Sequence, residues 1–438
     1  MSRKHSYPRW LAFSLSIFLS GQSAQPAQVD RPTAWRQVSA AMERQLPVSA
    51  LEPLGSILTN AVLEADWSDA ARAIARKAQI EMIIQGGLPD EGISRLSHAM
   101  KAAPPQTLPI LQSILASWHA RYFEENRWVL LSRSDLGATE GPDLNGWSLP
   151  RLLREIDSLF QASLTNATTL QALPIARFNG LLTTNITSDA MVPTLYDFLA
   201  RQALGFYKTT DWGLPPAEDD PMPEAAELQA ALRILFASSE VFIAESPTIR
   251  LPGGITNERC VELYRNLTRF HLNDADPTAL AAIELDRLTW ASTLDLGRSS
   301  VSDHARALRE FALRRPTHPS SADFWLTLAE ALNSQDQPLE AWNAAQEAMR
   351  RYPRTPAAET CKVLVHQLEH PSLEIFSEQI WNHGADSLAP EFEARYKNLS
   401  QVSFRWISIP LEQGLSAMDG IDAGAIEGWL KMKPVAEW

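Results

Sequence analysis

Apolar side chains recur at every third or fourth position over most of the chain, and this spacing predicts a succession of amphipathic helices. The clearest example is residues 322–353, where two such patterns flank the polar turn 333–338. Pro338 suits the first turn of the second helix, because its fixed backbone angle matches the helix and its missing N–H costs nothing there. The apolar positions are Trp325, Leu328, Ala329 and Leu332 in the first helix, and Ala341, Ala345 and Ala348 in the second. The stripe of small residues lets the two helices approach closely, so we expect an antiparallel helical hairpin.

This hairpin resembles the tetratricopeptide repeat, with Ala in place of the Gly and the Phe of that pattern. The repeat period of about 34 residues points back to Ala307, Phe311 and Pro319, which indicates one earlier repeat whose first helix matches poorly. A single repeat cannot bury its apolar face and must stack on its neighbours. The sequence therefore predicts a mainly α fold, built as a tetratricopeptide-like array of helical hairpins.

The same periodicity, read together with proline and glycine breaks, predicts helices along the rest of the chain. They cover residues 33–46, 48–65, 66–85, 88–103, 107–128, 149–164, 194–208, 224–245, 258–272, 277–296, 301–315, 356–369 and 372–382.

The first 23 residues have the pattern of a signal peptide. Arg3, Lys4 and Arg9 form a basic start, residues 11–19 are mostly apolar, and small residues follow at 21–23. The apolar run is shorter than the ~20 residues that a membrane-spanning helix needs. We therefore expect cleavage near residue 23 and a periplasmic or extracellular protein, the alternative being a buried amphipathic helix.

Three further segments follow from changes in composition. Residues 209–223 hold four prolines and four acidic residues without periodicity, and they predict a linker between helical domains at 24–208 and 224–389. Residues 402–409 alternate between apolar and polar side chains, which predicts a β-strand. We expect residues 390–438 to be an incomplete β-segment, the start of a β-sandwich, in which this strand has nothing to pair with.

Composition narrows the possible partners. The formal net charge of -13 argues against a nucleic-acid partner, because phosphate binding needs clustered Lys and Arg. Two cysteines, Cys260 and Cys361, are too few for a disulfide framework or a thiolate metal site, although they could pair with each other in an oxidising compartment.

One motif suggests chemistry. His366, Glu369 and His370 spell H-x-x-E-H, the signature of a class of zinc peptidases, in which two imidazoles share a helix face and the Glu acts as base. Pro371 argues against this, because the residue before a proline is pushed out of helical conformation. Two surface histidines at a helix end are the alternative.

The remaining candidates are weaker. Residues 273–276 contain two carboxylates but lack the further ligands of a calcium loop, so a cluster at a helix N-terminus is favoured. The pairs Gly86-Gly87 and Gly253-Gly254 lack the spacing and lysine of a phosphate loop, and no G-x-S-x-G motif occurs. We assign no catalytic, cofactor-binding or metal-binding residue, and we expect a protein that is not an enzyme and needs no cofactor.

Several stretches in one order resemble a known family. They are residues 80–83, Trp118-His-Ala-Arg-Tyr-Phe-Glu-Glu-Asn-Arg-Trp128, residues 192–200 with Phe206-Tyr207, and residues 378–405 around Tyr396-Lys-Asn-Leu399. Together, over roughly residues 34–406, the chain resembles the N-terminal helical region of bacterial alpha-2-macroglobulin-like proteins, described as large extracellular alpha-helical proteins.

This resemblance implies an exported protein whose later β-sandwich domains trap peptidases, with residues 396–409 entering the first of them. The bait region and the Cys-Gly-Glu-Gln thioester of that family lie far downstream, and neither Cys260 nor Cys361 stands in such a motif. We therefore expect a non-catalytic helical scaffold or docking module of a peptidase inhibitor, with a target peptidase or envelope component as partner. The alternative is a free-standing helical-repeat adaptor of the envelope that binds a protein or peptide in the groove between stacked hairpins.

Overall fold

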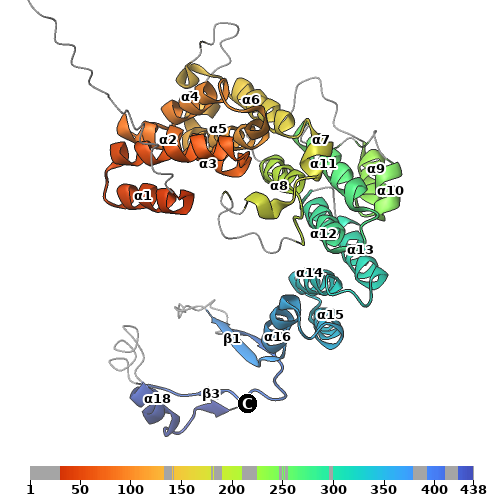
Figure 1. The fold of residues 1–438 in the computed structure, drawn as a ribbon. Helices are drawn as coiled ribbons and strands as arrows, with labels where there is room; N and C mark the ends of the chain where they lie inside the picture. Colours follow the sequence, from red (N-terminus) through yellow and green to blue (C-terminus); the bar gives the residue numbers. More distant parts are fainter. Residues whose placement is uncertain are drawn as a thin grey trace, which may run out of the picture. The chain divides into compact units, whose positions relative to one another are not determined.

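The computed structural model describes residues 30–132, 141, 143–178, 181, 190–209, 224–245, 249, 251, 255–294, 299–377, 392–409 and 423–437. These residues are mainly helical, with short antiparallel strands near the C-terminal end (Figure 1). The predicted signal peptide and residues 210–223 of the predicted linker lie outside this set. The chain forms two compact units. Unit 1 contains the residues up to Ala231 together with Ile243–Ile283, and unit 2 contains Leu232–Phe242 and the residues from Glu284 onward.

Unit 1 is a series of helices, most of which pack on the next one in the chain. They are α1 (Arg31–Glu43), α2 (Pro47–Leu63), α3 (Trp67–Ile84), α4 (Pro89–Met100), α5 (Leu108–Ser132), α6 (Leu149–Ser163), α7 (Ala167–Gln171), α8 (Leu195–Tyr207) and α11 (Ile255–His271), with 3-10 turns η1 (Pro105–Thr107), η2 (Leu144–Gly146) and η3 (Ile175–Phe178). α8 packs on both α5 and α11. All but the short α7 were predicted from periodicity, to within a few residues at each end. Pro47 and Pro89 each open a helix, and Asp66 caps α3 by accepting a hydrogen bond from the Asp69 N–H (3.1 Å).

Unit 2 contains the predicted hairpin array. α13 (Ser299–Arg314), α14 (Ser321–Ser334), α15 (Pro338–Arg351) and α16 (Pro356–Glu369) pack in sequence, and α14 also contacts α16. Trp325, Leu328, Ala341 and Ala345 are all buried at the α14–α15 contact, which confirms the predicted hairpin. Between the two helices Asp336 adopts a positive φ of 57°, a conformation that Asp tolerates better than most residues. The helical array is therefore the fold of this part of the chain.

The helix predicted over residues 372–382 is wrong. Residues Ser372–Ser377 instead form β1, which pairs antiparallel with β2 (Phe392–Lys397), while residues 378–382 lie outside the described set. Pro371 ends the helical backbone at His370, and the apolar pattern that follows is stabilised by a strand more than ten residues further along. Periodicity within a short window contains no information about such a partner.

The strand prediction over residues 402–409 is right in type but not in extent or pairing. Only Arg405–Trp406 forms a strand, β3, and it pairs with β4 (Ala436–Glu437). The expectation that this strand has no partner is therefore wrong. Helix α18 (Ala423–Leu430), which the sequence analysis did not predict, lies between β3 and β4.

The single helix predicted over residues 224–245 is two helices, α9 (Ala225–Leu235) and α10 (Ser239–Ala244). The break between α9 and α10 coincides with a contact to Arg287 on α12 (Thr278–Thr293). The guanidinium of Arg287 donates to the Leu235 carbonyl (2.6 Å) and the Ala237 carbonyl (2.9 Å). Carbonyls at the end of a helix have no partner within it, and a cation is favourable there. Arg287 thus stabilises the end of α9 from about 50 residues away.

Candidate functional site

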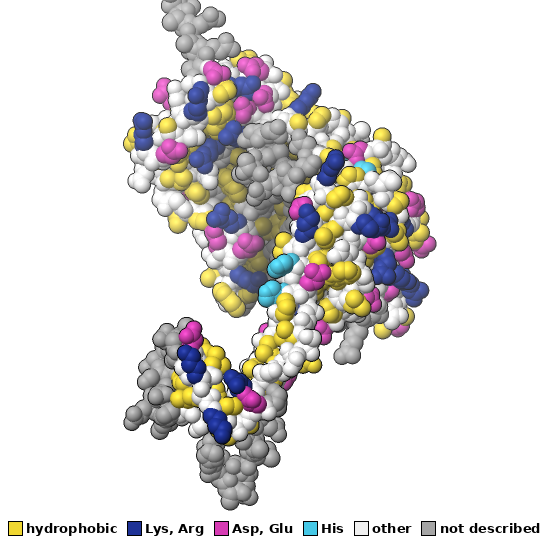
Figure 2. Space-filling model, turned by 90° about the horizontal axis from the view of Figure 1, so that it is seen from below, with side chains coloured by type: hydrophobic (Ala, Val, Ile, Leu, Met, Phe, Trp, Pro, Cys, Tyr) yellow, Lys and Arg dark blue, Asp and Glu magenta, His cyan; other side chains and the backbone are white. Residues whose placement is uncertain are grey.

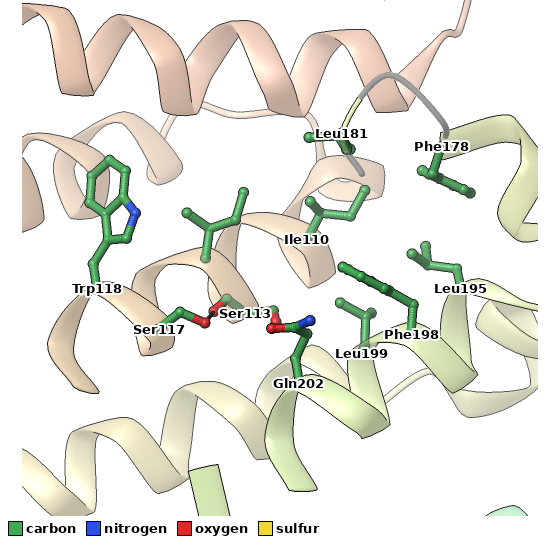
Figure 3. Close-up of a pocket in the computed structure, with 11 residues that line it drawn as sticks. Ile110, Ser113, Ser117, Trp118, Phe178, Leu181, Leu195, Phe198, Leu199 and Gln202 are labelled. Atoms are coloured by element: carbon green, nitrogen blue, oxygen red, sulfur yellow. Dashed lines mark hydrogen bonds between the residues drawn. The ribbon is translucent and has the colours of Figure 1, made fainter. Parts of the chain in front are cut away.

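A cavity of about 180 Å³ lies in unit 1 between α5, η3 and α8 (Figure 3). Its walls are mostly apolar, and Ser113, Ser117 and Gln202 are its polar lining residues. The Ser117 hydroxyl is already used, because it donates to the Ser113 carbonyl (2.9 Å). The apolar lining consists of Ile110, Ile114, Trp118, Phe178, Leu181, Leu195, Phe198 and Leu199. A cavity of this size accepts a single small apolar group, and none of its described lining residues carries a charge.

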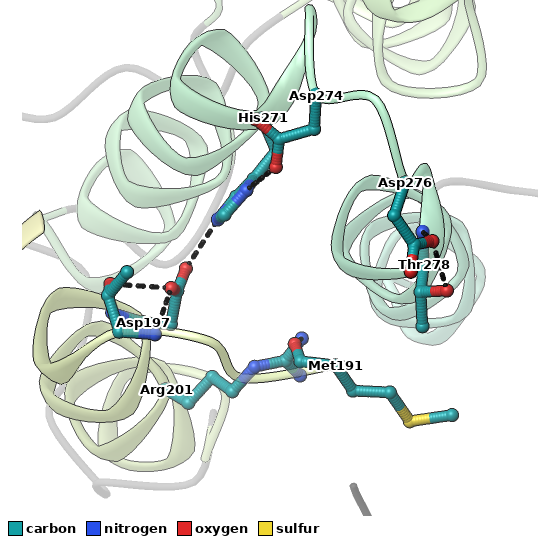
Figure 4. A network of polar contacts seen from close by, with 8 residues as sticks. Met191, Asp197, Arg201, His271, Asp274, Asp276 and Thr278 are labelled. Carbon is teal, nitrogen blue, oxygen red and sulfur yellow. Dashed lines mark hydrogen bonds and ion pairs between the residues drawn. The ribbon is translucent and has the colours of Figure 1, made fainter. Parts of the chain in front are cut away.

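Unit 1 also contains a largely buried polar constellation, a histidine between two carboxylates, which we call the histidine bridge (Asp197, His271 and Asp274; Figure 4). His271 is the last residue of α11, and its Nε2 lies 2.7 Å from Oδ1 of Asp197 near the start of α8. Its Nδ1 lies 2.6 Å from Oδ2 of Asp274 in the turn after α11. The side chains of His271 and Asp197 are each 1% exposed, whereas Asp274 is 40% exposed.

Asp197 also caps its own helix. Its Oδ2 accepts hydrogen bonds from the Thr194 N–H (3.0 Å) and the Thr194 hydroxyl (2.6 Å), while the Thr194 hydroxyl oxygen accepts from the Asp197 N–H (3.3 Å). This reciprocal arrangement is a capping box, which satisfies backbone N–H groups at the start of α8. The carboxylate of Asp197 therefore keeps its position whichever protonation state His271 has.

The surroundings favour the protonated form of His271. Burial acts to lower the pKa of the imidazole, but the hydrogen bonds and negative charges of Asp197 and Asp274 outweigh it and raise the pKa above 6.5. Both ring nitrogens face carboxylate oxygens, so the ring has no free nitrogen with which to act as a general base on a substrate. The histidine bridge is therefore an arrangement that joins two helices, and it lacks the nucleophile–base geometry of a catalytic triad.

The other end of the α8–α11 pair has a second polar constellation, which we call the arginine cluster (Asp157, Tyr207 and Arg259). Arg259 in the first turns of α11 donates from Nε to Asp157 Oδ1 (3.0 Å) and from a terminal nitrogen to Asp157 Oδ2 (3.3 Å). The hydroxyl of Tyr207, the last residue of α8, donates to the same Oδ1 (2.7 Å). Burial acts to lower the pKa of Arg259, but Asp157 outweighs it and raises that pKa, while burial and the bond to Asp157 raise the pKa of Tyr207.

The two carboxylates of residues 273–276, Asp274 and Asp276, have different hydrogen-bond partners. The predicted helix N-terminal role is correct for Asp276, whose Oδ1 accepts hydrogen bonds from the Thr278 N–H (2.9 Å) and hydroxyl (2.6 Å) at the start of α12. It does not describe Asp274, whose side chain binds His271 instead. Nothing in the local sequence distinguishes the two residues, because the partner Asp197 is 74 positions away from His271.

The H-x-x-E-H residues lie at the C-terminal end of α16. His370 has left the helix (φ -62°, ψ 125°), which confirms the expected effect of Pro371. The two imidazole rings have centroids 6.0 Å apart, and Glu369 accepts a hydrogen bond from Trp342 Nε1 (2.7 Å). Over the described part of the chain, no three His, Cys, Asp or Glu side chains gather as a metal site would require.

Both cysteines are buried. Burial, with a smaller contribution from the charge of Glu330, raises the pKa of the Cys361 thiol to about 11. Such a thiol is protonated at neutral pH and is a poor nucleophile.

Unit 2 has a buried histidine, His304, whose pKa is shifted in the direction opposite to that of His271. His304 on α13 is 6% exposed and packs on the ring of Phe236, with centroids 5.9 Å apart. Among the described residues its Nε2 has no hydrogen-bond partner. Burial lowers the pKa of His304 to about 4, so this ring is neutral where His271 is charged.

On the surface, acidic and basic side chains are interspersed on the face shown in Figure 2. None of the helices in the described ranges has both the length and the apolar character of a membrane-spanning segment. No protein-family model, curated protein or solved structure matches the chain.

Proposed function

We propose that this chain is a non-catalytic helical module of an exported alpha-2-macroglobulin-like peptidase inhibitor, in which it serves as a scaffold or docking surface. The ordered resemblance over residues 34–406 suggests the family. The observation that supports the docking role most directly is the hairpin of β1 and β2, which follows α16.

The hairpin has two unlike faces. Residues directly opposite each other in an antiparallel pair lie on the same face, so Leu373 with Tyr396 and Ile375 with Ala394 form an apolar face. Glu374 with Arg395 lies on the other face. Ile375 is 54% and Tyr396 65% exposed. A two-stranded hairpin is marginally stable alone, so an exposed apolar face of this kind suits packing against further β-structure.

The hairpin is also attached to the helical array. Lys397 donates to the Gln367 carbonyl (2.8 Å) and Asn398 to the Leu368 carbonyl (2.6 Å), both in the last turn of α16. These bonds satisfy carbonyls that have no partner within the helix, and a lysine is favourable at that end. The two bonds hold the hairpin on the last turn of α16, so its apolar face has a defined position for packing against a β-domain.

The intact mass of the native protein, purified from its own source, tests this proposal. A native chain several-fold heavier than 48.7 kDa supports a macroglobulin-type assembly, and incubation with a peptidase should then leave that peptidase retained in the same gel-filtration peak. A native mass of about 48.7 kDa, less a signal peptide, overturns the trap and leaves the free-standing adaptor, for which the stacked helices α13–α16 offer the binding surface.

A matched pair of variants tests the hairpin itself. Ile375→Arg places a charge on the apolar face, and Glu374→Gln changes the adjacent residue on the charged face without placing a like charge opposite Arg395. We expect I375R in the full native protein to increase hydrogen exchange of β1 and to lower peptidase retention, and E374Q to change neither. Equal behaviour of the two variants would contradict a docking role of the apolar face.

A further inference from the structure

The histidine bridge places one imidazole between two carboxylates, so its hydrogen bonds depend on whether the ring is protonated. One ring joins a carboxylate on α8 to a carboxylate in the turn after α11, and it can donate to both only as an imidazolium. A neutral imidazole has one N–H, so it can satisfy only one of the two. Loss of a single proton therefore has to release one carboxylate.

The structure indicates which carboxylate is released. Asp197 is 1% exposed, and an unpaired buried carboxylate is costly, whereas Asp274 is 40% exposed and can turn to water. The tautomer of neutral His271 with the lower free energy therefore keeps Nε2–H donating to Asp197 and leaves the Nδ1 lone pair facing Asp274 Oδ2. That contact, 2.6 Å in the structure, is then repulsive.

We propose that the histidine bridge is a proton-operated latch of the turn between α11 and α12. With His271 protonated, Asp274 is held on the ring and the turn is ordered. After deprotonation the ring stays on Asp197, and Asp274 leaves with the turn. This property is independent of the function proposed above.

Other polar groups near the bridge do not compete for the proton. On α8, burial raises the pKa of Tyr196 to about 12, so its hydroxyl is neutral throughout, and Arg201 donates to the Met191 carbonyl (3.2 Å). In the turn, Asp276 holds the start of α12 through Thr278. Phe270 packs against the His271 ring, with centroids 4.3 Å apart. The two carboxylates of the bridge are thus the groups that respond to the proton on His271.

The test is hydrogen exchange of residues 272–278 in the full chain between pH 5.5 and 9, corrected for the intrinsic pH dependence of exchange. We expect protection to fall about tenfold or more as His271 deprotonates, the effect of one charge-assisted hydrogen bond. Ring nitrogen chemical shifts should show both nitrogens protonated at low pH and the Nε2–H form at high pH. The midpoint should lie above 6.5, while His304 should not titrate in this range.

Two matched variants separate the latch from a merely structural contact. In Asp274→Asn the side-chain amide can donate to the Nδ1 lone pair of a neutral ring, so the turn should stay protected across the whole pH range. Asp276→Asn removes the same charge two residues away without touching the ring, and it should keep the pH dependence of the wild-type protein. The proposal is overturned if wild-type protection does not change across the His271 titration, or if D274N changes with pH as the wild type does.

Discussion

The arginine cluster and the histidine bridge lie at opposite ends of the α8–α11 pair, and the arginine cluster binds both helices to Asp157 of α6. In the arginine cluster Asp157 binds Arg259, and their side chains are 22% and 27% exposed. In the histidine bridge Asp197 binds His271, and both are 1% exposed. The cation of the more buried constellation is thus a histidine, whose charge depends on pH and whose pKa is raised above 6.5, whereas arginine remains charged at every pH the protein meets. A change of pH therefore acts on one end of the helix pair and leaves the other intact.

Within unit 1 the largest effect is expected from Asp157→Ala, which removes the shared acceptor of the arginine cluster. Arg259 then keeps only the more exposed Glu262 as a described acceptor, and the hydroxyl of the buried Tyr207 loses its acceptor, so the local free energy of unfolding of α8 and α11 should fall by about 2–3 kcal/mol. The loss should be the same at pH 6 and pH 8.5. Native-state hydrogen exchange of the two helices measures it, and Ser158→Ala, at an exposed neighbouring position, is the control.

His271→Gln should cost about 2 kcal/mol at pH 6, because it leaves Asp197 buried without its cation. The pKa of His271 is raised in the folded state, so its contribution to stability is fully present below about pH 6.5 and is lost as the pH rises through the folded pKa. The difference in stability between wild type and H271Q should therefore shrink as the pH rises through the folded-state pKa of His271. A loss of stability in H271Q that does not change with pH would contradict the difference in pH dependence between the histidine bridge and the arginine cluster.

His304 should show the opposite sign in unit 2. Its pKa is lowered to about 4, so its neutral ring stabilises the fold above about pH 6.5, and this stability is lost as the pH falls toward 4. Replacement by the uncharged ring of Phe, His304→Phe, should therefore abolish an acid destabilisation of unit 2 of up to about 3 kcal/mol. Hydrogen exchange of α13 at pH 4.5 and pH 7 measures this effect separately from unit 1.

Arg259→Lys should have a smaller effect, about 1 kcal/mol, because lysine keeps the charge but cannot bind both oxygens of Asp157.

The smallest effect is expected from Glu262→Gln. Glu262 also accepts from Arg259 (3.0 Å), but its side chain is 49% exposed, so its loss should cost less than about 0.5 kcal/mol. A cost of E262Q equal to that of R259K would show that the outer ion pair, and not Asp157, holds Arg259.

Most of the helices could be predicted because their cause is local. The apolar spacing of α14 and α15, the proline that opens α15 and the proline after His370 act within a few residues, and the predicted hairpin and the end of α16 agree with the structure. The predictions that were wrong concern segments whose conformation depends on a distant partner. β1 needs β2, and the break between α9 and α10 needs Arg287.

The candidate site follows the same division. The sequence by itself determined that residues 273–276 contain two carboxylates, that His271 lies in the last turn of a helix and that Asp197 lies in the first turn of another, because each of these depends on neighbouring residues. Only the tertiary structure decided that the three side chains meet, because packing of α11 on α8 brings together residues 74 positions apart. The raised pKa of His271, and with it any response to pH, depends on that meeting, since an isolated histidine and two separate carboxylates would titrate near their ordinary values.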